Sequence, residues 1–150
     1  CPREWTMHKK ILLAYNGSAH SAAALRQAGE LAKLAGAELH ILGIVVTTGG
    51  LVMAQAAGSL DVIEMERVRI EKALEEAALG LTAAGIQVTT CVRQGEPAAE
   101  IIAHARKIHA DLTVLGHTDK GLLARWFEGG SVGAKLLAHL PCSLLIATDR

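Results

Sequence analysis

The chain has 150 residues, a length typical of one domain that buries a substantial core. Hydrophobic residues make up 51% of it and aromatic residues only 3%, so the core must be built mainly from Ala, Leu, Ile and Val. Fifteen basic and fifteen acidic side chains cancel, and no long basic run occurs. The charge pattern therefore argues against a nucleic-acid-binding protein.

The three cysteines, Cys1, Cys91 and Cys142, form no CxxC pair and no even-numbered framework. No signal peptide is recognised, so we expect reduced thiols in a cytoplasmic protein. Residues 1–8 are expected to be an N-terminal extension left by processing, and the whole chain of 1–150 is interpreted as one domain.

Strands and helices are predicted to alternate along the chain. The first strand is expected at 11–16, and Ser18 or Ser21 could cap the helix that follows and ends at Gly36. Asp61 is predicted to cap a long helix ending at Gly85, and Glu96-Pro97 opens a third helix. A fourth helix is expected from Ser131 to Leu140. The remaining strands are predicted at 37–46, 86–95, 110–116 and 142–149.

The segment from Ile41 to Leu60 has no charged residue across twenty positions, which is the length of a membrane-spanning helix. It contains two polar stretches with glycine, Thr47-Thr48-Gly49-Gly50 and Gly58-Ser59. Its first part includes the β-branched run Ile44-Val45-Val46. These features favour a buried strand followed by an apolar loop, so we expect no membrane association.

The β-α alternation predicts an α/β fold: an open five-stranded parallel sheet with helices on both faces. In such sheets, ligands bind beyond the carboxyl ends of the strands, where the strand order reverses. The segments 14–18, 44–48 and 116–131 are therefore expected to surround one crevice.

The loop "VLGHTDKGLLARWFEGGSV" (114–132) resembles a phosphate-binding loop but fails two familiar patterns. Four residues separate Gly116 from Gly121, as in a Walker A loop, but two leucines follow in place of Lys-Ser/Thr. The dinucleotide pattern GxGxxG is missing after the first strand, where only Gly17 stands. Neither P-loop hydrolysis nor NAD binding is predicted.

Anion binding at Gly129-Gly130-Ser131 remains open. These residues would present backbone N–H groups and a hydroxyl at a helix start, with Lys120 and Arg125 nearby. The simpler alternative is that the glycines let the chain turn and Ser131 only caps the helix.

Other polar residues form no convincing site. His117 and Asp119 are two positions apart but lack a third ligand, so no metal site is expected. His104 and His109 are interpreted as solvent-facing or half-buried, and Cys142 as a packed, inert thiol. The charges of "EMERVRIEKALEE" (64–76) indicate a solvated helix face with pairs such as Arg67–Glu71.

From about Lys9 to Thr148 the chain resembles the universal stress protein family. Three segments carry the resemblance: "KKILLAYNGSAHSAAALRQAGELAKLAGAELHILGIVV", "GEPAAEIIAHARKIHADLTVLG" and "ARWFEGGSVGAKLLAHLPCSLLIA". The resemblance implies a Rossmann-like domain of the adenine nucleotide alpha hydrolase-like type. It also implies a cytoplasmic homodimer, often paired through the last strand, here Cys142 to Ala147.

The family contains members that bind ATP and members that do not. The resemblance implies that a binding member would use ATP, with Mg as a companion ion. Ala14, Tyr15 and Asn16 would line the adenosine side of the site. Ile44 would pack on adenine or accept a hydrogen bond from it through its backbone oxygen. The residues around the ribose and phosphates would be Gly116, His117, Asp119, Gly130, Ser131 and Val132.

The chain departs from the binding pattern G-x2-G-x9-G-S/T in two places. Asp119 stands where the second glycine belongs, and the spacer from Lys120 to Gly129 has ten residues. An unpaired carboxylate about 5 Å from a phosphate oxygen costs about 1 kcal/mol or more, roughly five- to tenfold in affinity. Asn16 replaces the usual aspartate and removes one negative charge, which partly compensates.

Two functions follow from this resemblance. The first is a stress-response module that binds an adenine nucleotide. The alternative is a protein that binds no nucleotide and acts through dimerisation and the apolar loop 47–60, with a protein partner that the sequence does not name. We do not expect an enzyme, because no catalytic constellation is found; slow ATP hydrolysis would be the form of any turnover.

Overall fold

Five parallel strands form one sheet in the computed structural model, which describes residues 9–18, 21–46, 61–117 and 136–148. The strand order is β3-β2-β1-β4-β5. Their bounds are β1 Lys10–Ala14, β2 Glu38–Val46, β3 Val88–Gly95, β4 Leu112–His117 and β5 Ser143–Thr148. The predicted α/β fold with a five-stranded parallel sheet is thus confirmed.

Two registers fix the centre of the sheet. Leu13 of β1 lies opposite Ile41 of β2 on one side and Val114 of β4 on the other. The start of β1 is also held by Asp111, which immediately precedes β4. Its carboxylate Oδ2 accepts the backbone N–H groups of Lys9 and Lys10 at 2.8 and 2.9 Å.

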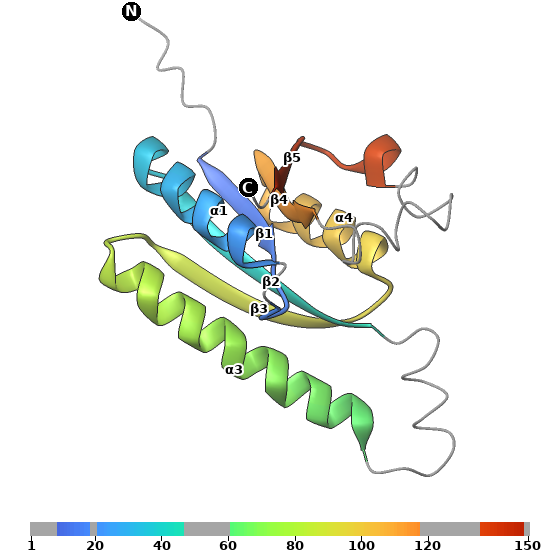
Figure 1. Ribbon diagram of the computed structural model, residues 1–150. Helices are drawn as coiled ribbons and strands as arrows, with labels where there is room; N and C mark the ends of the chain where they lie inside the picture. The colour runs from blue at the N-terminus through green and yellow to red at the C-terminus, as the bar shows by residue number, and fades with distance from the viewer. Residues whose placement is uncertain (1–8, 19–20, 47–60, 118–135, 149–150) are drawn as a thin grey trace, which may run out of the picture.

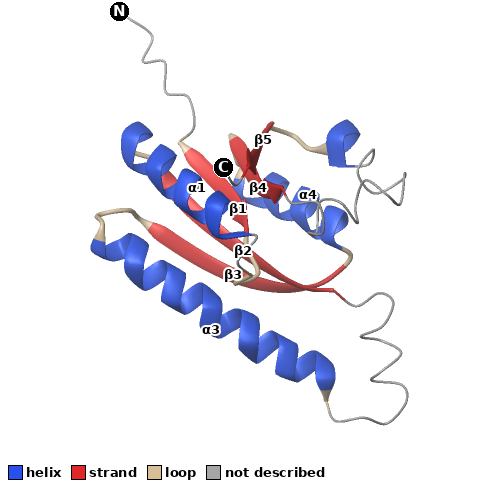
Figure 2. Cartoon of the chain, in the orientation of Figure 1, coloured by secondary structure: helices blue, strands red, loops and turns tan. Residues whose placement is uncertain are grey.

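Three helices are defined within the described residues: α1 Ala22–Ala35, α3 Val62–Ala83 and α4 Pro97–Ile108. Figure 1 shows α1 and α3 on one side of the sheet and α4 on the other, and Figure 2 shows the same layers by element type. Residues 136–139 are also helical and lead into β5. Helices therefore cover both faces of the sheet, as predicted.

Most helix ends follow the expected capping residues. The Asp61 side chain accepts from the backbone N–H of Glu64 at 3.3 Å, and Gly36 closes α1 in the left-handed conformation. The Glu96 carboxylate accepts from the N–H groups of Ala98 and Ala99, with Pro97 in the first turn. Ser21 precedes α1 but makes no side-chain capping bond to the helix.

The core is aliphatic and divided by the sheet into two clusters. The cluster under α1 and α3 contains Ile11, Leu13, Ile41, Ile70 and Leu74, all at most 1% exposed. The cluster under α4 contains Leu12, Leu42, Ala98, Ile101, Ile102 and Leu136. Successive residues of β1 therefore point to opposite layers, which is why this central strand is apolar on both faces.

The predicted strands differ from the observed ones mainly at their ends. Strand β1 stops at Ala14, so Tyr15 and Asn16 lie beyond it in a turn, and β4 extends one residue further, to His117. Of the segment 41–60, the part up to Val46 is strand, as expected, and 47–60 lies outside the described residues. None of the helices in the described ranges is both long and apolar enough to cross a membrane.

Candidate functional site

The strand order reverses between β1 and β4. Strands β2 and β3 follow β1 outward on one side, whereas β4 and β5 are added on the other. The connections that leave β1 and β4 therefore diverge to opposite sides at the carboxyl edge of the sheet, which opens a crevice between them in folds of this type. Leu13 and Val114 are the last residues paired between β1 and β4, and Tyr15 and Gly116 each follow two residues later.

The turn after β1 is held by its own side chains. The Oδ1 atom of Asn16 accepts the backbone N–H of Ser18 at 3.0 Å and lies 3.1 Å from the Ser21 hydroxyl. Because a backbone N–H can only donate, the atom at this position must be the amide oxygen, and the amide NH2 points elsewhere. Ser18 and Ser21 thus shape the turn that leads into α1.

Helix α3 also contacts this turn. Arg69 donates through Nη1 to the backbone oxygen of Asn16 at 3.1 Å. Gly17 has a φ of +80°, and a Cβ built on it would lie 2.6 Å from Cβ of Ala73. Glycine is therefore required here both by the positive φ and by the close approach of the helix.

The predicted site residues within the described part of the chain lie on neighbouring strand ends. Ala14 and Ile44 are half-buried and pack against the cluster under α4. Gly116 pairs with Ala147 near the end of β4, and His117 is the last residue of that strand. The other members, Asp119, Gly130, Ser131 and Val132, lie outside the described residues.

Tyr15 differs from its neighbours in the direction of its side chain. Its ring packs against the cluster under α1 and α3, on the opposite layer from Ala14 and Ile44. Its backbone N–H donates to the oxygen of Leu42 at 3.0 Å and so continues the β1–β2 ladder by one bond. Burial, with a smaller contribution from Glu76, raises the pKa of the phenol, so the hydroxyl stays protonated at neutral pH.

Three interpretations of polar side chains can be compared with the structure. The prediction of a solvent-facing or half-buried His104 is wrong, because its side chain is only 7% exposed, whereas His109 is exposed. Arg67 pairs with Glu64 and Gln94 and not with Glu71. Cys142 is half-buried and lies 3.2 Å from the Thr113 hydroxyl; burial raises the pKa of its thiol, consistent with an inert cysteine.

His104 belongs to the α4 layer. Burial, and then the nearby charges of Arg93, His40 and Lys107, lower the pKa of its imidazole. Its Nδ1 atom has no hydrogen-bond partner among the described residues. No group of three or more His, Cys, Asp or Glu residues that could hold a metal ion occurs in the described ranges.

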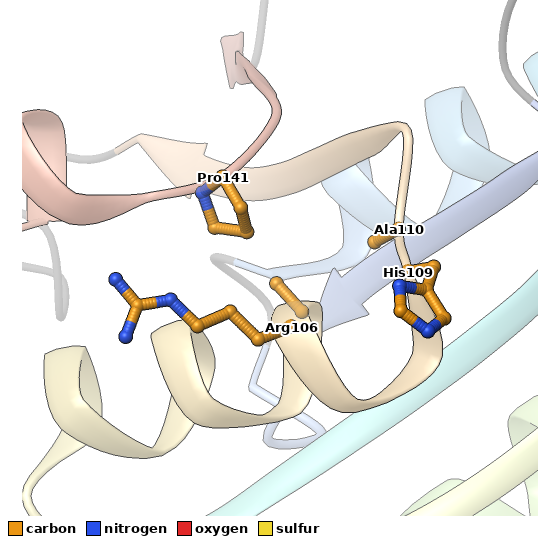
Figure 3. A pocket seen from close by; sticks show the side chains of 5 residues that line it. Arg106, His109, Ala110 and Pro141 are labelled. Carbon is orange, nitrogen blue, oxygen red and sulfur yellow. The ribbon is translucent and has the colours of Figure 1, made fainter.

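A separate hollow lies between the end of α4 and the segment that leads into β5. It is lined by Ala105, Arg106, His109, Ala110 and Pro141, and Figure 3 labels the last four of these. Arg106 donates through Nη2 to the backbone oxygen of His139 at 3.3 Å and links the two sides. Ala110 and Pro141 precede β4 and β5, so this hollow lies at the opposite edge of the sheet from the crevice at β1 and β4.

The sequence patterns do not reveal the contact of Arg69 with the turn after β1. Most of the charged side chains in its segment, 64–76, are exposed to solvent, as predicted. No spacing rule connects Arg69 with Asn16, which lies 53 positions earlier in the sequence. For His104 a signal is present: it lies three residues after Ile101 and four before Ile108, on the apolar stripe of α4.

The observed topology defines a doubly wound α/β protein. Residues 7–148 match the model of the universal stress protein family, and the chain therefore belongs to that family. A universal stress protein of Bacillus subtilis, YxiE, is 37% identical, with 93% of this chain and 99% of the relative covered. Another, from Methanocaldococcus jannaschii, is 32% identical, with 93% and 82% covered.

Solved structures show the same fold. A universal stress protein family member from Burkholderia pseudomallei superimposes with a TM-score of 0.67 at 27% identity, over 94% of this chain and 96% of that one. A universal stress protein in complex with cAMP gives 0.65 at 22% identity, over 94% and 97%. A family protein from Arabidopsis thaliana with AMP bound gives 0.67 at 16% identity, over 95% and 92%.

Proposed function

We propose that this protein is a cytoplasmic stress-response module that binds an adenine nucleotide in the crevice at the carboxyl ends of β1, β2 and β4. The observation that carries the proposal is the reversal of strand order between β1 and β4, beside a turn held by Asn16. Two proteins of the same fold, described as complexes with cAMP and with AMP, support adenine nucleotides as the ligand class.

In this proposal, Ala14 and Ile44 provide the apolar wall for adenine, because both side chains lie on the same layer. Tyr15 and Asn16 contribute their backbone atoms, and Asn16 also contributes its side-chain NH2. This amide carries no negative charge that would repel a phosphate. Gly116, His117, Asp119, Gly130, Ser131 and Val132 would surround the ribose and phosphates. Mg would accompany ATP and offset the charge of Asp119.

Calorimetric titration tests the proposal. Protein freed of co-purified nucleotide by dialysis is titrated separately with Mg-ATP and with AMP, and the variant Asp119→Gly is measured in parallel. We expect heat of binding in the parent protein and about five- to tenfold tighter Mg-ATP binding in Asp119→Gly, because a carboxylate near the phosphates is removed. If neither protein gives a heat of binding, nucleotide binding is rejected.

The second candidate function is a stress protein that acts through dimerisation and partner contact alone. Its surface for dimerisation would be β5, an edge strand whose Ile146 side chain is exposed. We propose that this strand pairs with a second copy of the chain in either function. Binding of a protein partner with no nucleotide requirement would favour the second function.

We do not propose turnover as the function of this protein. Weak ATP hydrolysis is the one activity to test, by comparing phosphate release from the parent with that from Ser131→Trp. Equal release in both would assign any residual hydrolysis to a contaminant.

A further inference from the structure

Arg69 on α3 makes three directed contacts, two with Glu66 on the same helix and one with the turn after β1. Its Nε and Nη2 atoms donate to the two carboxylate oxygens of Glu66 at 2.9 and 2.6 Å. The remaining terminal nitrogen, Nη1, donates to the backbone oxygen of Asn16 at 3.1 Å. Because the bidentate pair with Glu66 fixes the plane of the guanidinium, the bond to Asn16 has a defined direction.

The next residue of the turn is held by packing. Gly17 adopts φ +80° and lies against Ala73, which is four residues after Arg69 on α3. Residues four apart share a face of a helix, so one face of α3 provides both the hydrogen bond to Asn16 and the contact with Gly17. The turn after β1 is therefore held by the hydrogen bonds of Ser18 and Ser21 with Asn16 and by its contacts with α3.

We propose that the Glu66–Arg69 pair is a positioning device for the crevice: it sets where the turn at Asn16 and Gly17 presents its backbone and the Asn16 amide to a bound nucleotide. This inference rests on the proposed nucleotide binding. Arg69 acts through the turn and not by touching the ligand, so it is a positioning residue.

Electrostatic attraction of a phosphate is the competing explanation for any effect of Arg69. Its side chain is 52% exposed, and its charge is paired with Glu66. The two explanations predict opposite results for Glu66→Gln. Removing a negative charge strengthens binding of an anion if charge is what matters, whereas loss of the partner that orients Arg69 weakens binding if position is what matters.

The test compares four variants of the full chain by calorimetry with Mg-ATP and AMP. For Arg69→Gln we expect about three- to tenfold weaker binding, since a charge-assisted hydrogen bond to the turn is lost. For Glu66→Gln we expect weaker binding as well. Arg69→Lys should recover only part of the loss, because one ammonium cannot reproduce the three contacts. The matched control is Arg67→Gln, which removes the same charge from α3 but breaks contacts with Gln94 and Glu64.

Tighter binding by Glu66→Gln, full recovery in Arg69→Lys, or an equal loss in Arg67→Gln would each overturn the positioning role. Hydrogen exchange of the Ser18 amide gives a readout that needs no ligand, because this N–H is bonded to Asn16 Oδ1. We expect faster exchange in Arg69→Gln and Glu66→Gln than in Arg67→Gln, and equal rates would contradict the restraint itself. If the parent binds neither nucleotide while the exchange rates differ as expected, nucleotide binding fails and the restraint on the turn stands.

Discussion

Single glycines determine how closely α3 approaches the sheet. Gly43 lies in the middle of β2, and a Cβ built on it would be 2.4 Å from Ile70 Cγ2 and 3.2 Å from Leu74 Cδ1. Both of these side chains are fully buried, so neither can move aside without disturbing the core. Because Gly43 has no side chain, Ile70 and Leu74 of α3 can pack directly against β2.

We predict that Gly43→Ala destabilises the protein by about 1–3 kcal/mol through overpacking. Urea denaturation followed by circular dichroism measures the change. Gly80→Ala is the matched control, because Gly80 lies within α3 and a Cβ added there would meet no other atom, so the substitution is expected to stabilise by about 0.5–1 kcal/mol. Similar effects of the two substitutions would argue against the close approach at Gly43.

His104 gives the protein a pH-dependent stability. Burial and nearby positive charges lower the pKa of the folded-state imidazole below its usual 6.5. The unfolded chain therefore takes up the proton first as pH falls, so the stability present above pH 6.5 is lost as the pH decreases toward the folded-state pKa. The residues whose charges act on this imidazole are Arg93, His40 and Lys107.

We predict that His104→Leu reduces the loss of stability between about pH 7.5 and pH 5.5. The substitution removes the titrating group and also its unpartnered Nδ1. Urea midpoints at the two pH values, determined for both proteins, provide the test. An equal loss in parent and variant would show that other groups cause the acid sensitivity.

At the scale of elements, two helices end in the same left-handed conformation with different residues. Gly36 ends α1 at φ +63°, whereas His109 ends α4 at φ +55°. A side chain in this region costs roughly 1 kcal/mol relative to glycine. The helix that borders the hollow at Pro141 thus ends at a strained histidine.

We predict opposite effects at these two positions. Gly36→Ala should destabilise by about 1 kcal/mol, and His109→Gly should stabilise by about 0.5–1 kcal/mol. Thermal unfolding of both variants measures the effects. No gain of stability in His109→Gly would indicate that His109 makes compensating contacts in the native state.

The elements can be predicted well from the sequence because their signals are local. Apolar runs, Asp61, Pro97 and Gly36 mark strands, starts and ends within a few neighbouring residues. The predicted strand ends are off by one or two residues because pairing with a neighbouring strand decides where a strand stops. The restraint by Arg69 could not be predicted, since it joins residues 53 positions apart through the packing of α3.

At the scale of the whole molecule, the sheet has two edges with different surfaces. The exposed residues of β3 include Thr89, Thr90 and the charged Arg93, whereas those of β5 are Ser143, Ile146 and Thr148, with no charged residue among them. A charged side chain such as Arg93 discourages pairing at an edge, and an exposed isoleucine favours it. The dimer proposed above is therefore expected at β5 and not at β3.

We predict that Ile146→Lys converts the dimer to monomers at micromolar protein concentration. Sedimentation velocity measures the oligomeric state. Leu34→Lys is the control, because Leu34 on α1 is 85% exposed and lies outside the proposed interface. A dimer that survives Ile146→Lys would place the interface elsewhere.

The bond between Asp111 and the start of β1 has a consequence for synthesis of the chain. Strand β1 pairs on one side with a strand about thirty residues later and on the other with one about a hundred residues later. While the chain is being made, β1 to β3 can assemble first, leaving the apolar residues Ile11, Leu12 and Leu13 on an unpaired edge. Only when Asp111 and β4 emerge is that edge covered. A ribosome that pauses between β3 and β4 would therefore prolong the exposure of this apolar edge.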